Sequence, residues 1–283
     1  MSDPITWLYV PGDRPERFAK AAASGADVVI VDLEDAVAAD HKDAARRNAV
    51  AWLADAAPGS VEIRVNAAGT PWHEADLQAL EALEAPGALE ALPADGALRA
   101  VRVPKVESAE AVRRVATRVP VPIVCLLETA LGVESAFEIA RCGNVAAIGL
   151  GEADLAGDLD VRTAAALTWA RSRVVVAARA AGLPSPAMSV HPHVHDDAGL
   201  RASSLAGRDL GFFGRAAIHL RQLPVITEVF AVDADELRDA EVVLAALDEA
   251  VARGSGVTVL PDGRMLDAAM LAQARRTIAR ARR

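Results

Sequence analysis

Short apolar runs, each closed by a proline, a glycine or an acidic residue, recur along most of the chain and alternate with longer amphipathic stretches. Runs of this length are too short for helices and are typical of parallel strands that are buried on both faces. The predicted strands cover residues 7–10, 27–34, 61–66, 98–103, 122–128, 145–154, 187–190 and 216–220.

The stretches between these runs carry helix signals. Pro15 lies near the first position of one predicted helix, Ser108 is a good N-cap for another, and Gly182 followed by Pro184 ends a long one that begins near Thr163. Eight strand–helix units in strict alternation over roughly 230 residues predict an α/β fold, a closed (β/α)8 TIM barrel. Its active rim should lie where the C-terminal ends of the strands meet.

The residues after 224 fall outside the eight-unit pattern. They predict a helix from about Asp235 to Arg253, two short strands around the turn Pro261-Asp-Gly263, and a last helix. We therefore expect a catalytic barrel domain over residues 1–224 and a C-terminal extension over residues 225–283 that packs on a neighbouring subunit.

Composition and charge narrow the class of protein. Of the 283 residues, 52% are hydrophobic and only 4% aromatic, so the core must be built mainly from Ala, Val and Leu. The formal charge of −9 argues against nucleic acid as a partner. No segment has the pattern of a leader or a membrane span, and Cys125 and Cys142 suit neither a disulfide framework nor a paired metal site. A reducing cytoplasm is the expected location.

Two successive strands end close to a carboxylate. Glu128 and Asp154 would lie side by side, and Gly149 and Gly151 allow close approach of the backbone. Two carboxylates in this position form a hard oxygen site suited to Mg²⁺, with positions left open for substrate oxygens. The alternative is that Glu128 caps the helix from Leu131 and that Asp154 caps a later turn.

Charged side chains also gather at the ends of the second and third strands. Asp32, Glu34 and Asp35 form the densest acidic cluster near a strand, and Arg64 ends the next strand along the chain. From the strand pattern alone, Arg64 points either into the barrel or to a half-exposed surface.

Two further motifs admit two interpretations each. His191, His193 and His195 alternate, as metal ligands can on an extended segment, but Pro192 and the acids that follow favour a polar loop. Arg215 follows the tight turn Gly211-Phe-Phe-Gly214 and is a candidate for holding a phosphate, although a lone pair of glycines is weak support.

Seven motifs occur together in an order found in one protein family. They are Tyr9-Val-Pro-Gly-Asp-Arg-Pro-Glu-Arg-Phe-Ala-Lys20, Val31-Asp-Leu-Glu-Asp-Ala-Val37, Ile63-Arg-Val-Asn66, Val103-Pro-Lys-Val-Glu107, Leu127-Glu-Thr-Ala130, Gly211-Phe-Phe-Gly214 with Ile218-His219, and Gly263-Arg-Met-Leu-Asp267. With this combination the chain resembles the citrate lyase β-subunit-like proteins, which group with the HpcH/HpaI aldolases, malyl-CoA lyases and citramalyl-CoA lyases. The resemblance covers nearly the whole chain and implies a (β/α)8 barrel that binds Mg²⁺ and assembles as a homotrimer or hexamer.

The resemblance also implies roles for single residues. Glu128 and Asp154 would be the metal ligands, and Arg64 would face the thioester and oxo-acid oxygens. Glu34 and Asp35 would lie near the metal-bound waters.

Other implied roles concern residues farther along the chain. Asp267 matches an acid that a neighbouring subunit lends to the active site, and Arg215 stands where the family favours a lysine for cofactor binding. The chain departs from the family at Ile5-Thr6, where an arginine is common, and at Leu220. These departures bear on the CoA contacts and on the identity of the substrate.

The implied activity is that of a Mg²⁺-dependent carbon–carbon lyase. Its substrate would be a 3-hydroxyacyl-CoA such as citryl-CoA, malyl-CoA or citramalyl-CoA, and its products an acetyl-CoA-type thioester and a 2-oxo acid: oxaloacetate, glyoxylate or pyruvate. Which of Glu34, Asp35 and Asp267 acts as acid or base stays open. The alternatives are a CoA-independent class II oxo-acid aldolase and a non-catalytic subunit that binds Mg²⁺ and an oxo acid within a lyase complex.

Overall fold

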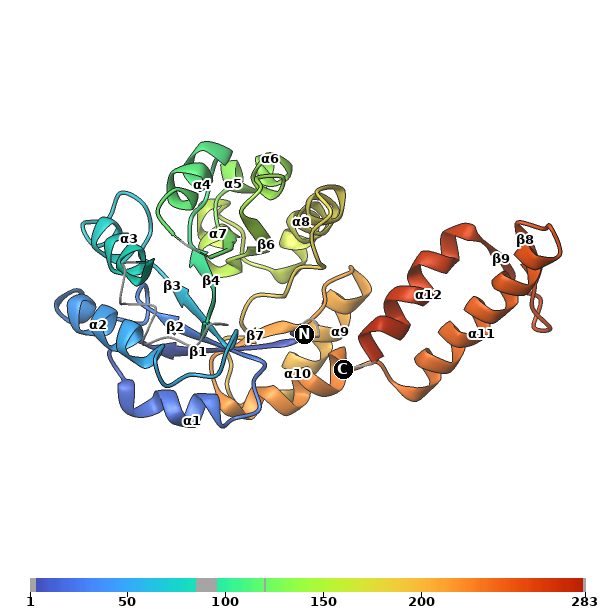
Figure 1. Cartoon of the computed structure of the whole chain (residues 1–283), viewed down its shortest axis with the longest axis horizontal. Helices are drawn as coiled ribbons and strands as arrows, with labels where there is room; N and C mark the ends of the chain where they lie inside the picture. The colour runs from blue at the N-terminus through green and yellow to red at the C-terminus, as the bar shows by residue number, and fades with distance from the viewer. Residues whose placement is uncertain (1–3, 85–95, 120, 282–283) are drawn as a thin grey trace. The chain divides into compact units, whose positions relative to one another are not determined.

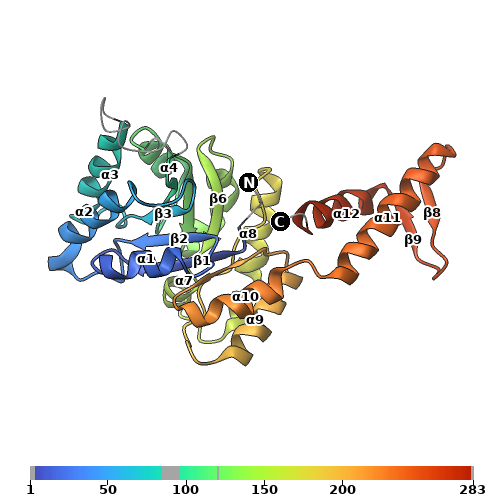
Figure 2. The ribbon, with the colours of Figure 1, turned by 60° about the horizontal axis from the view of Figure 1, so that its bottom comes forward.

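The computed structural model describes residues 4–84, 96–119 and 121–281. It divides the chain into two compact units, Pro4–Val229 and the part from Phe230 onward. Figures 1 and 2 show the elements of both units, which are described separately below.

One curled parallel sheet forms the centre of the first unit, with its strands in the order β6-β5-β4-β3-β2-β1-β7 (Figure 1). The strands are β1 Thr6–Pro11, β2 Val28–Asp32, β3 Val61–Arg64, β4 Leu98–Val103, β5 Ile123–Leu127, β6 Val145–Leu150 and β7 Arg215–Ala217. β7 pairs with β1 rather than with β6, so the last strand of the unit lies beside the first. Because all strands of this sheet are parallel, their C-terminal ends lie along one curved rim.

Helices cover the outside of this sheet (Figure 2). The α-helices are α1 Phe18–Ala22, α2 Lys42–Trp52, α3 His73–Glu81, α4 Ala109–Ala116, α5 Ala130–Glu134, α6 Ala136–Ala140, α7 Glu152–Asp158, α8 Thr168–Ala180, α9 Asp197–Asp209 and α10 Leu223–Phe230. The 3-10 helices are η1 Pro15–Arg17, η2 Ala39–His41, η3 Ala82–Glu84, η5 Ala164–Leu167 and η6 Leu220–Gln222. Side-chain oxygens of Ser108, Thr129 and Asp196 accept backbone N–H bonds at the starts of α4, α5 and α9, which explains where these helices begin.

The predicted seventh strand, 187–190, is present only as an isolated bridge between Met188 and Arg215. The Met188 N–H donates to the Gly214 carbonyl oxygen, and the Met188 carbonyl oxygen accepts the Ala216 N–H, both at 3.0 Å. Pro186 and Pro192 flank the segment and have no N–H to donate, so a longer ladder cannot form there. With this segment in place the arrangement is a (β/α)8 TIM-barrel-like fold, which confirms the predicted fold class.

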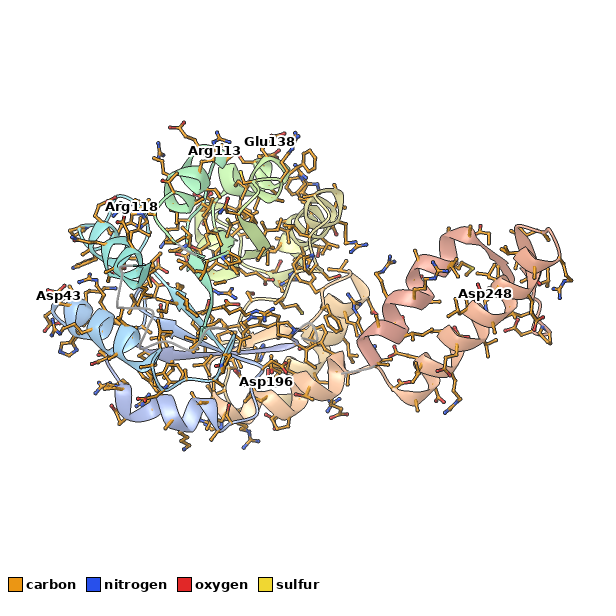
Figure 3. All side chains as sticks on the ribbon, viewed as in Figure 1. Asp43, Arg113, Arg118, Glu138, Asp196 and Asp248 are labelled. Carbon is orange, nitrogen blue, oxygen red and sulfur yellow. The ribbon has the colours of Figure 1, made fainter. Side chains whose placement is uncertain are left out.

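The core lies between the sheet and its helices. All residues of β2 and β5 are buried, and small Ala and Val side chains fill much of the space against the helices. Charged side chains such as Asp43 on α2, Arg113 on α4 and Glu138 on α6 project from the outer surface (Figure 3). Of the helices in the described ranges, none has the length and apolarity needed to cross a bilayer.

The second unit is a helical hairpin with a small sheet. It contains α11 Ala234–Ala252, the antiparallel strands β8 Val257–Val259 and β9 Met265–Asp267, and α12 Ala268–Ala281. A capping box formed by Asp233 and Glu236 begins α11. Its own core consists of Ala240, Val243, Leu247, Leu260, Leu266 and Ala274.

Candidate active site

Asp32 ends β2 at the rim of the sheet and is 1% exposed. Its Oδ1 accepts the Glu34 N–H at 2.9 Å, and its Oδ2 accepts the Ala36 N–H at 3.1 Å. These two bonds fold the chain back on itself after the strand. The segment that carries Glu34 and Asp35 is therefore anchored to a buried carboxylate.

Arg64 ends β3 next to Asp32. Its Nε and Nη2 donate to the two oxygens of Asp32 at 2.7 and 2.6 Å, which is the bidentate geometry that arginine makes with a carboxylate. Its Nη1 donates to Asp35 at 3.1 Å, and its guanidinium carbon lies 5.1 Å from the centre of the Tyr9 ring. Burial by itself lowers the pKa of Arg64, but the bonds and charge of Asp32 raise it above its ordinary value. The guanidinium therefore stays charged.

Glu34 is buried beside Arg64. Its Oε2 lies 2.9 Å from Arg64 Nη1 as an ion pair, yet this buried oxygen accepts no hydrogen bond of acceptable geometry among the described residues. Burial, with a further contribution from Asp35 and Asp32, raises the pKa of Glu34 despite the opposing charges of Arg64 and Lys105. A buried carboxyl with a raised pKa is suited to accept or donate a proton.

Lys42, the first residue of α2, binds the backbone of the segment that carries Glu34. Its Nζ donates to the carbonyl oxygens of Leu33 and Glu34 at 2.7 and 2.6 Å, and it lies 5.1 Å from the centre of the Trp72 ring. Burial lowers its pKa. With Asp32 on one side and Lys42 on the other, the backbone around Glu34 has little freedom to move.

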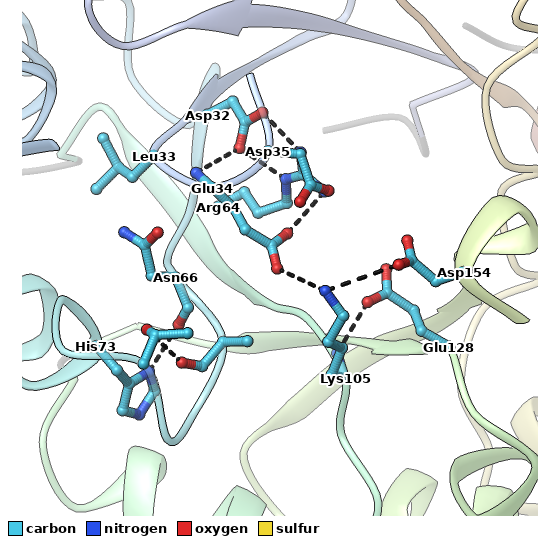
Figure 4. A network of polar contacts seen from close by, with 12 residues as sticks. Asp32, Leu33, Glu34, Asp35, Arg64, Asn66, His73, Lys105, Glu128 and Asp154 are labelled. Carbon is cyan, nitrogen blue, oxygen red and sulfur yellow. Dashed lines mark hydrogen bonds and ion pairs between the residues drawn. The ribbon is translucent and has the colours of Figure 1, made fainter. Parts of the chain in front are cut away.

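Glu128 and Asp154 face this cluster across the rim, with Lys105 between the two groups (Figure 4). Glu128 follows β5 and is 3% exposed; its Oε2 accepts the Lys105 N–H at 3.1 Å. Lys105 Nζ lies 3.3 Å from Glu34 Oε1 and 3.7 Å from Asp154 Oδ1. The predicted neighbours Glu128 and Asp154 are thus brought together.

The local context of these two acids differs from the prediction. β6 ends at Leu150, and Asp154 lies in the first turn of α7 rather than at the end of a strand, because the chain turns at Gly151 into the helix. The capping alternative for Glu128 is wrong, since Thr129 caps α5 and its Oγ1 accepts the Gly132 N–H at 3.1 Å.

The pair fits a divalent cation. Burial and the charges of Glu34 and Asp154 raise the pKa of Glu128 to about 7 against the opposing charges of Arg64 and Lys105, and a bound divalent cation would offset this excess of negative charge. A Cβ at Gly151 would lie 2.2 Å from Glu128 Oε1, so only glycine leaves room for this carboxylate. In the described ranges no three Asp, Glu, His or Cys side chains form a metal cluster. Mg²⁺ tolerates such a site because it keeps several waters and is often held by one or two carboxylates.

Two further predicted site residues, Arg215 and Asp267, have contacts of their own. Arg215 is 5% exposed and donates to Ser189 O and to the hydroxyls of Ser203 and Ser204 on α9; burial lowers its pKa to about 10. Its guanidinium therefore bonds to α9 and to the segment before His191. Asp267 belongs to the second unit, where its Oδ1 accepts the Ala269 N–H at 2.9 Å.

The three histidines of the 191–195 segment form no metal cluster in the described ranges. His191 lies 3.4 Å from Asp196 Oδ2, and its ring meets that of His193 edge to face with centroids 5.8 Å apart. The polar-loop interpretation is the one that fits, because Asp196 caps α9 directly after this segment.

Sequence reasoning assigned no role to Lys42 or Lys105. Lys105 lies in one of the quoted motifs, Val103-Pro-Lys-Val-Glu107, and this position was the only available signal. Its contacts depend on a left-handed backbone with φ of 51°, and those of Lys42 depend on α2 folding back onto the residues that follow β2. Neither follows from a local pattern.

Comparisons with known proteins agree with this geometry. Residues 6–220 match the family described as HpcH/HpaI aldolase/citrate lyase. The chain is 36% identical over 280 residues to a (3S)-malyl-CoA thioesterase of Cereibacter sphaeroides, covering 97% of this chain and 93% of the relative. It is 30% identical over 291 residues to the citrate lyase subunit beta of Leuconostoc mesenteroides, covering 96% and 91%.

A solved structure also matches over the full length. This is the protein CitE from Mycobacterium tuberculosis, in complex with magnesium, acetoacetate and coenzyme A; it has a TM-score of 0.80 and 33% identity, and the match covers 100% of this chain and 99% of that chain. The family match and these relatives together span the rim and the strands that build it. The chain therefore belongs to the HpcH/HpaI aldolase/citrate lyase family.

Proposed function

We propose that this protein is a Mg²⁺-dependent carbon–carbon lyase that cleaves a 3-hydroxyacyl-CoA of the malyl-CoA type into an acetyl-CoA-type thioester and a 2-oxo acid. The observation that carries the proposal is the rim itself. Arg64, fixed by Asp32, lies beside the buried carboxyl of Glu34, and Lys105 links Glu34 to the Glu128–Asp154 pair. The magnesium and coenzyme A in the related CitE structure support the same ligands here.

The reaction needs a proton acceptor, an electrophile and a means to hold the oxo acid. Mg²⁺ held by Glu128 and Asp154 would acidify the substrate hydroxyl and bind the 2-oxo acid that forms. Glu34 is the acid best suited to take the hydroxyl proton, because burial raises its pKa and Lys105 Nζ connects it to Asp154 of the proposed metal site. The C–C bond then breaks, and its electron pair becomes the enolate of the thioester fragment.

Arg64 is suited to stabilise that enolate oxygen, because its charge is held rigidly and does not have to reorganise during the reaction. The enolate carbon must then receive a proton. We assign this step to Asp267 of a second copy in a closed oligomer, a homotrimer or hexamer. In the β8–β9 register, Val259 pairs with Met265 and Val257 with Asp267, so one face of this hairpin carries three exposed apolar side chains together with the acid. Such a face is suited to dock on another subunit.

A second candidate is thioester hydrolysis, favoured by the 36% identity to the (3S)-malyl-CoA thioesterase. In that reaction Glu34 would take a proton from water, and Arg64 would stabilise the oxyanion that forms at the thioester carbonyl. The bond broken is C–S instead of C–C, so the products distinguish the two reactions.

The test is turnover of malyl-CoA, citramalyl-CoA and citryl-CoA with Mg²⁺, followed by mass spectrometry of the acyl-CoA pool. A lyase yields acetyl-CoA and a 2-oxo acid in equal amounts, whereas a thioesterase yields free CoA thiol and the intact hydroxy acid. Glu128→Gln serves as the control for dependence on the metal site. Cleavage of free hydroxy-oxo acids without CoA would instead indicate the class II aldolase, and binding of Mg²⁺ and oxaloacetate without any turnover would indicate the non-catalytic subunit.

A further inference from the structure

Lys105 has an unusual backbone for its residue type. Its φ is 51°, and Asp160 is the only other described residue besides glycine with a positive φ. A residue with a Cβ is disfavoured in this region and persists there when its surroundings hold it. Here the conformation aims the Lys105 N–H at Glu128 Oε2, 3.1 Å away.

The same conformation sends the side chain into the rim. Lys105 Nζ lies 3.3 Å from Glu34 Oε1 and 3.7 Å from Asp154 Oδ1 (Figure 4). Lys105, which follows β4, thus contacts three carboxyl groups. They come from the ends of β2 and β5 and from α7. Its side chain is 39% exposed, so the ammonium can leave this position without unpacking the core.

The positive charges are shared unequally between the cluster around Asp32 and the Glu128–Asp154 pair. Arg64 is directed toward Asp32, Asp35 and Glu34. Among the described residues, Lys105 is the one lysine or arginine that forms an ion pair with Asp154 or bonds to Glu128. The Lys105 ammonium is therefore the one cation paired with Asp154 in the described ranges, whereas Glu128 accepts the backbone N–H of Lys105 and is influenced by the charges of both Arg64 and Lys105.

We propose that Lys105 is the internal counter-ion of the Glu128–Asp154 pair and exchanges with the divalent cation. This inference rests on the proposed metal site. An ammonium at 3.7 Å from Asp154 Oδ1 and a divalent cation bound to the same carboxylate would repel each other at close range in a partly buried site. When the metal binds, the ammonium moves away from Asp154 and keeps Glu34 as its partner. Lys105 thereby sets the affinity for the metal, and metal loading changes the contacts of the acid proposed to take the substrate proton.

The experiment is a calorimetric titration of the full-length protein with Mg²⁺ alone, in the absence of any thioester or oxo acid. The variants are Lys105→Met, which removes the charge and keeps an unbranched chain, and Lys105→Arg, which keeps the charge. We expect Lys105→Met to bind Mg²⁺ about tenfold or more tightly than the wild type, because the competing cation is gone. Lys105→Arg should bind Mg²⁺ with an affinity close to that of the wild type.

An Mg²⁺ affinity of Lys105→Met equal to or weaker than that of the wild type, or no binding by either protein, overturns the proposal. If Lys105 served the substrate instead, Mg²⁺ binding would be unchanged and only oxaloacetate affinity would fall, which also overturns it. Thermal melts identify a variant that fails to fold, and Lys105→Gln then takes its place under the same criterion. Failure of the proposed lyase activity is seen separately, as normal Mg²⁺ binding without thioester turnover.

Discussion

At the scale of single residues, Asp32 shows how one buried carboxylate defines a strand end. Its oxygens accept four hydrogen bonds, from Arg64 Nε and Nη2 and from the N–H groups of Glu34 and Ala36. A carboxylate offers about four acceptor positions, so Asp32 has no acceptor position left for a metal. Its role is to hold Arg64 in one orientation.

Arg64→Lys tests that role. Lysine keeps the charge but cannot donate to both oxygens of Asp32 in the planar arrangement that Arg64 makes. We expect a folded protein whose kcat on the preferred thioester falls by roughly 10²-fold, the scale of one lost oxyanion donor. Arg118→Lys is the matched control, because Arg118 donates to Glu74 and Glu81 on the exposed surface. Wild-type turnover by Arg64→Lys would assign Arg64 a purely structural role.

Glu128 makes the metal-free protein sensitive to pH. Its pKa is raised from 4.5 to about 7 by burial and by Glu34 and Asp154, so the folded state holds a proton that the unfolded state releases. Stability from this group is fully present below about pH 4.5 and is lost as the pH rises through 7. The loss is about 3 kcal/mol at most, because each tenfold change in proton affinity corresponds to about 1.4 kcal/mol.

Urea unfolding of the EDTA-treated protein between pH 5 and pH 8 measures this contribution. Glu128→Gln should flatten the slope and be more stable than the wild type at pH 8, since its amide carries no charge to bury. Mg²⁺ should restore the wild type's stability at pH 8 but leave Glu128→Gln unchanged. A variant with the same pH slope as the wild type would show that another group titrates in this range.

At the scale of elements, the strands were predictable because turn-bounded apolar runs are short and regular. β4 has the predicted bounds, Leu98–Val103. The predicted sixth strand ran on to Asp154, because a buried strand followed by an apolar helical turn looks like one continuous run in sequence. The site acids could be placed at one rim because alternating strands and helices bring strand ends together. The left-handed backbone of Lys105 depends on contacts between distant segments, which a local pattern does not contain.

Gly151 and Gly157 lie at two ends of α7 and offer a matched pair of substitutions. A Cβ at Gly151 would meet Glu128 Oε1 at 2.2 Å, whereas one at Gly157 would meet nothing within 4 Å. Because the φ of Gly151 is −96°, its backbone accepts alanine and only this contact is changed. We expect Gly151→Ala to displace the carboxylate and weaken Mg²⁺ binding at least tenfold, on the order of one lost ligand interaction.

Gly157→Ala should leave Mg²⁺ affinity unchanged and stabilise α7 by up to about 1 kcal/mol, since alanine is the better helix former. Calorimetry with Mg²⁺ and thermal melts on both variants make the comparison. Equal Mg²⁺ affinities for the two would mean that the Glu128 carboxylate takes another position when it binds the metal.

At the scale of the whole molecule, the chain consists of two units with separate cores. Arg64 belongs to the first, and Asp267 belongs to the second. The outward face of the β8–β9 hairpin, with Val257, Val259 and Met265 exposed, is the kind of surface that an oligomer covers. Under the proposed mechanism, this division would let one copy complete the site of another.

Subunit mixing tests the proposal that Asp267 acts in trans. Arg64→Ala and Asp267→Ala should each be inactive alone, and hybrids of the two should recover activity at sites where both residues are intact. Native mass spectrometry confirms that hybrids have formed. Hybrid oligomers without any recovered turnover would place Asp267 in its own chain's site or outside the reaction.

The packing of Arg64 against Tyr9 has a practical consequence. Tyr9 is the single tyrosine of the chain, and the guanidinium carbon of Arg64 lies 5.1 Å from the centre of its ring. Uniform incorporation of 3-fluorotyrosine would therefore label one position, directly beneath the charge proposed to stabilise the enolate. Fluorine NMR of that protein should follow a single nucleus, whose chemical shift responds whenever a bound anion draws the guanidinium toward itself or away from the ring.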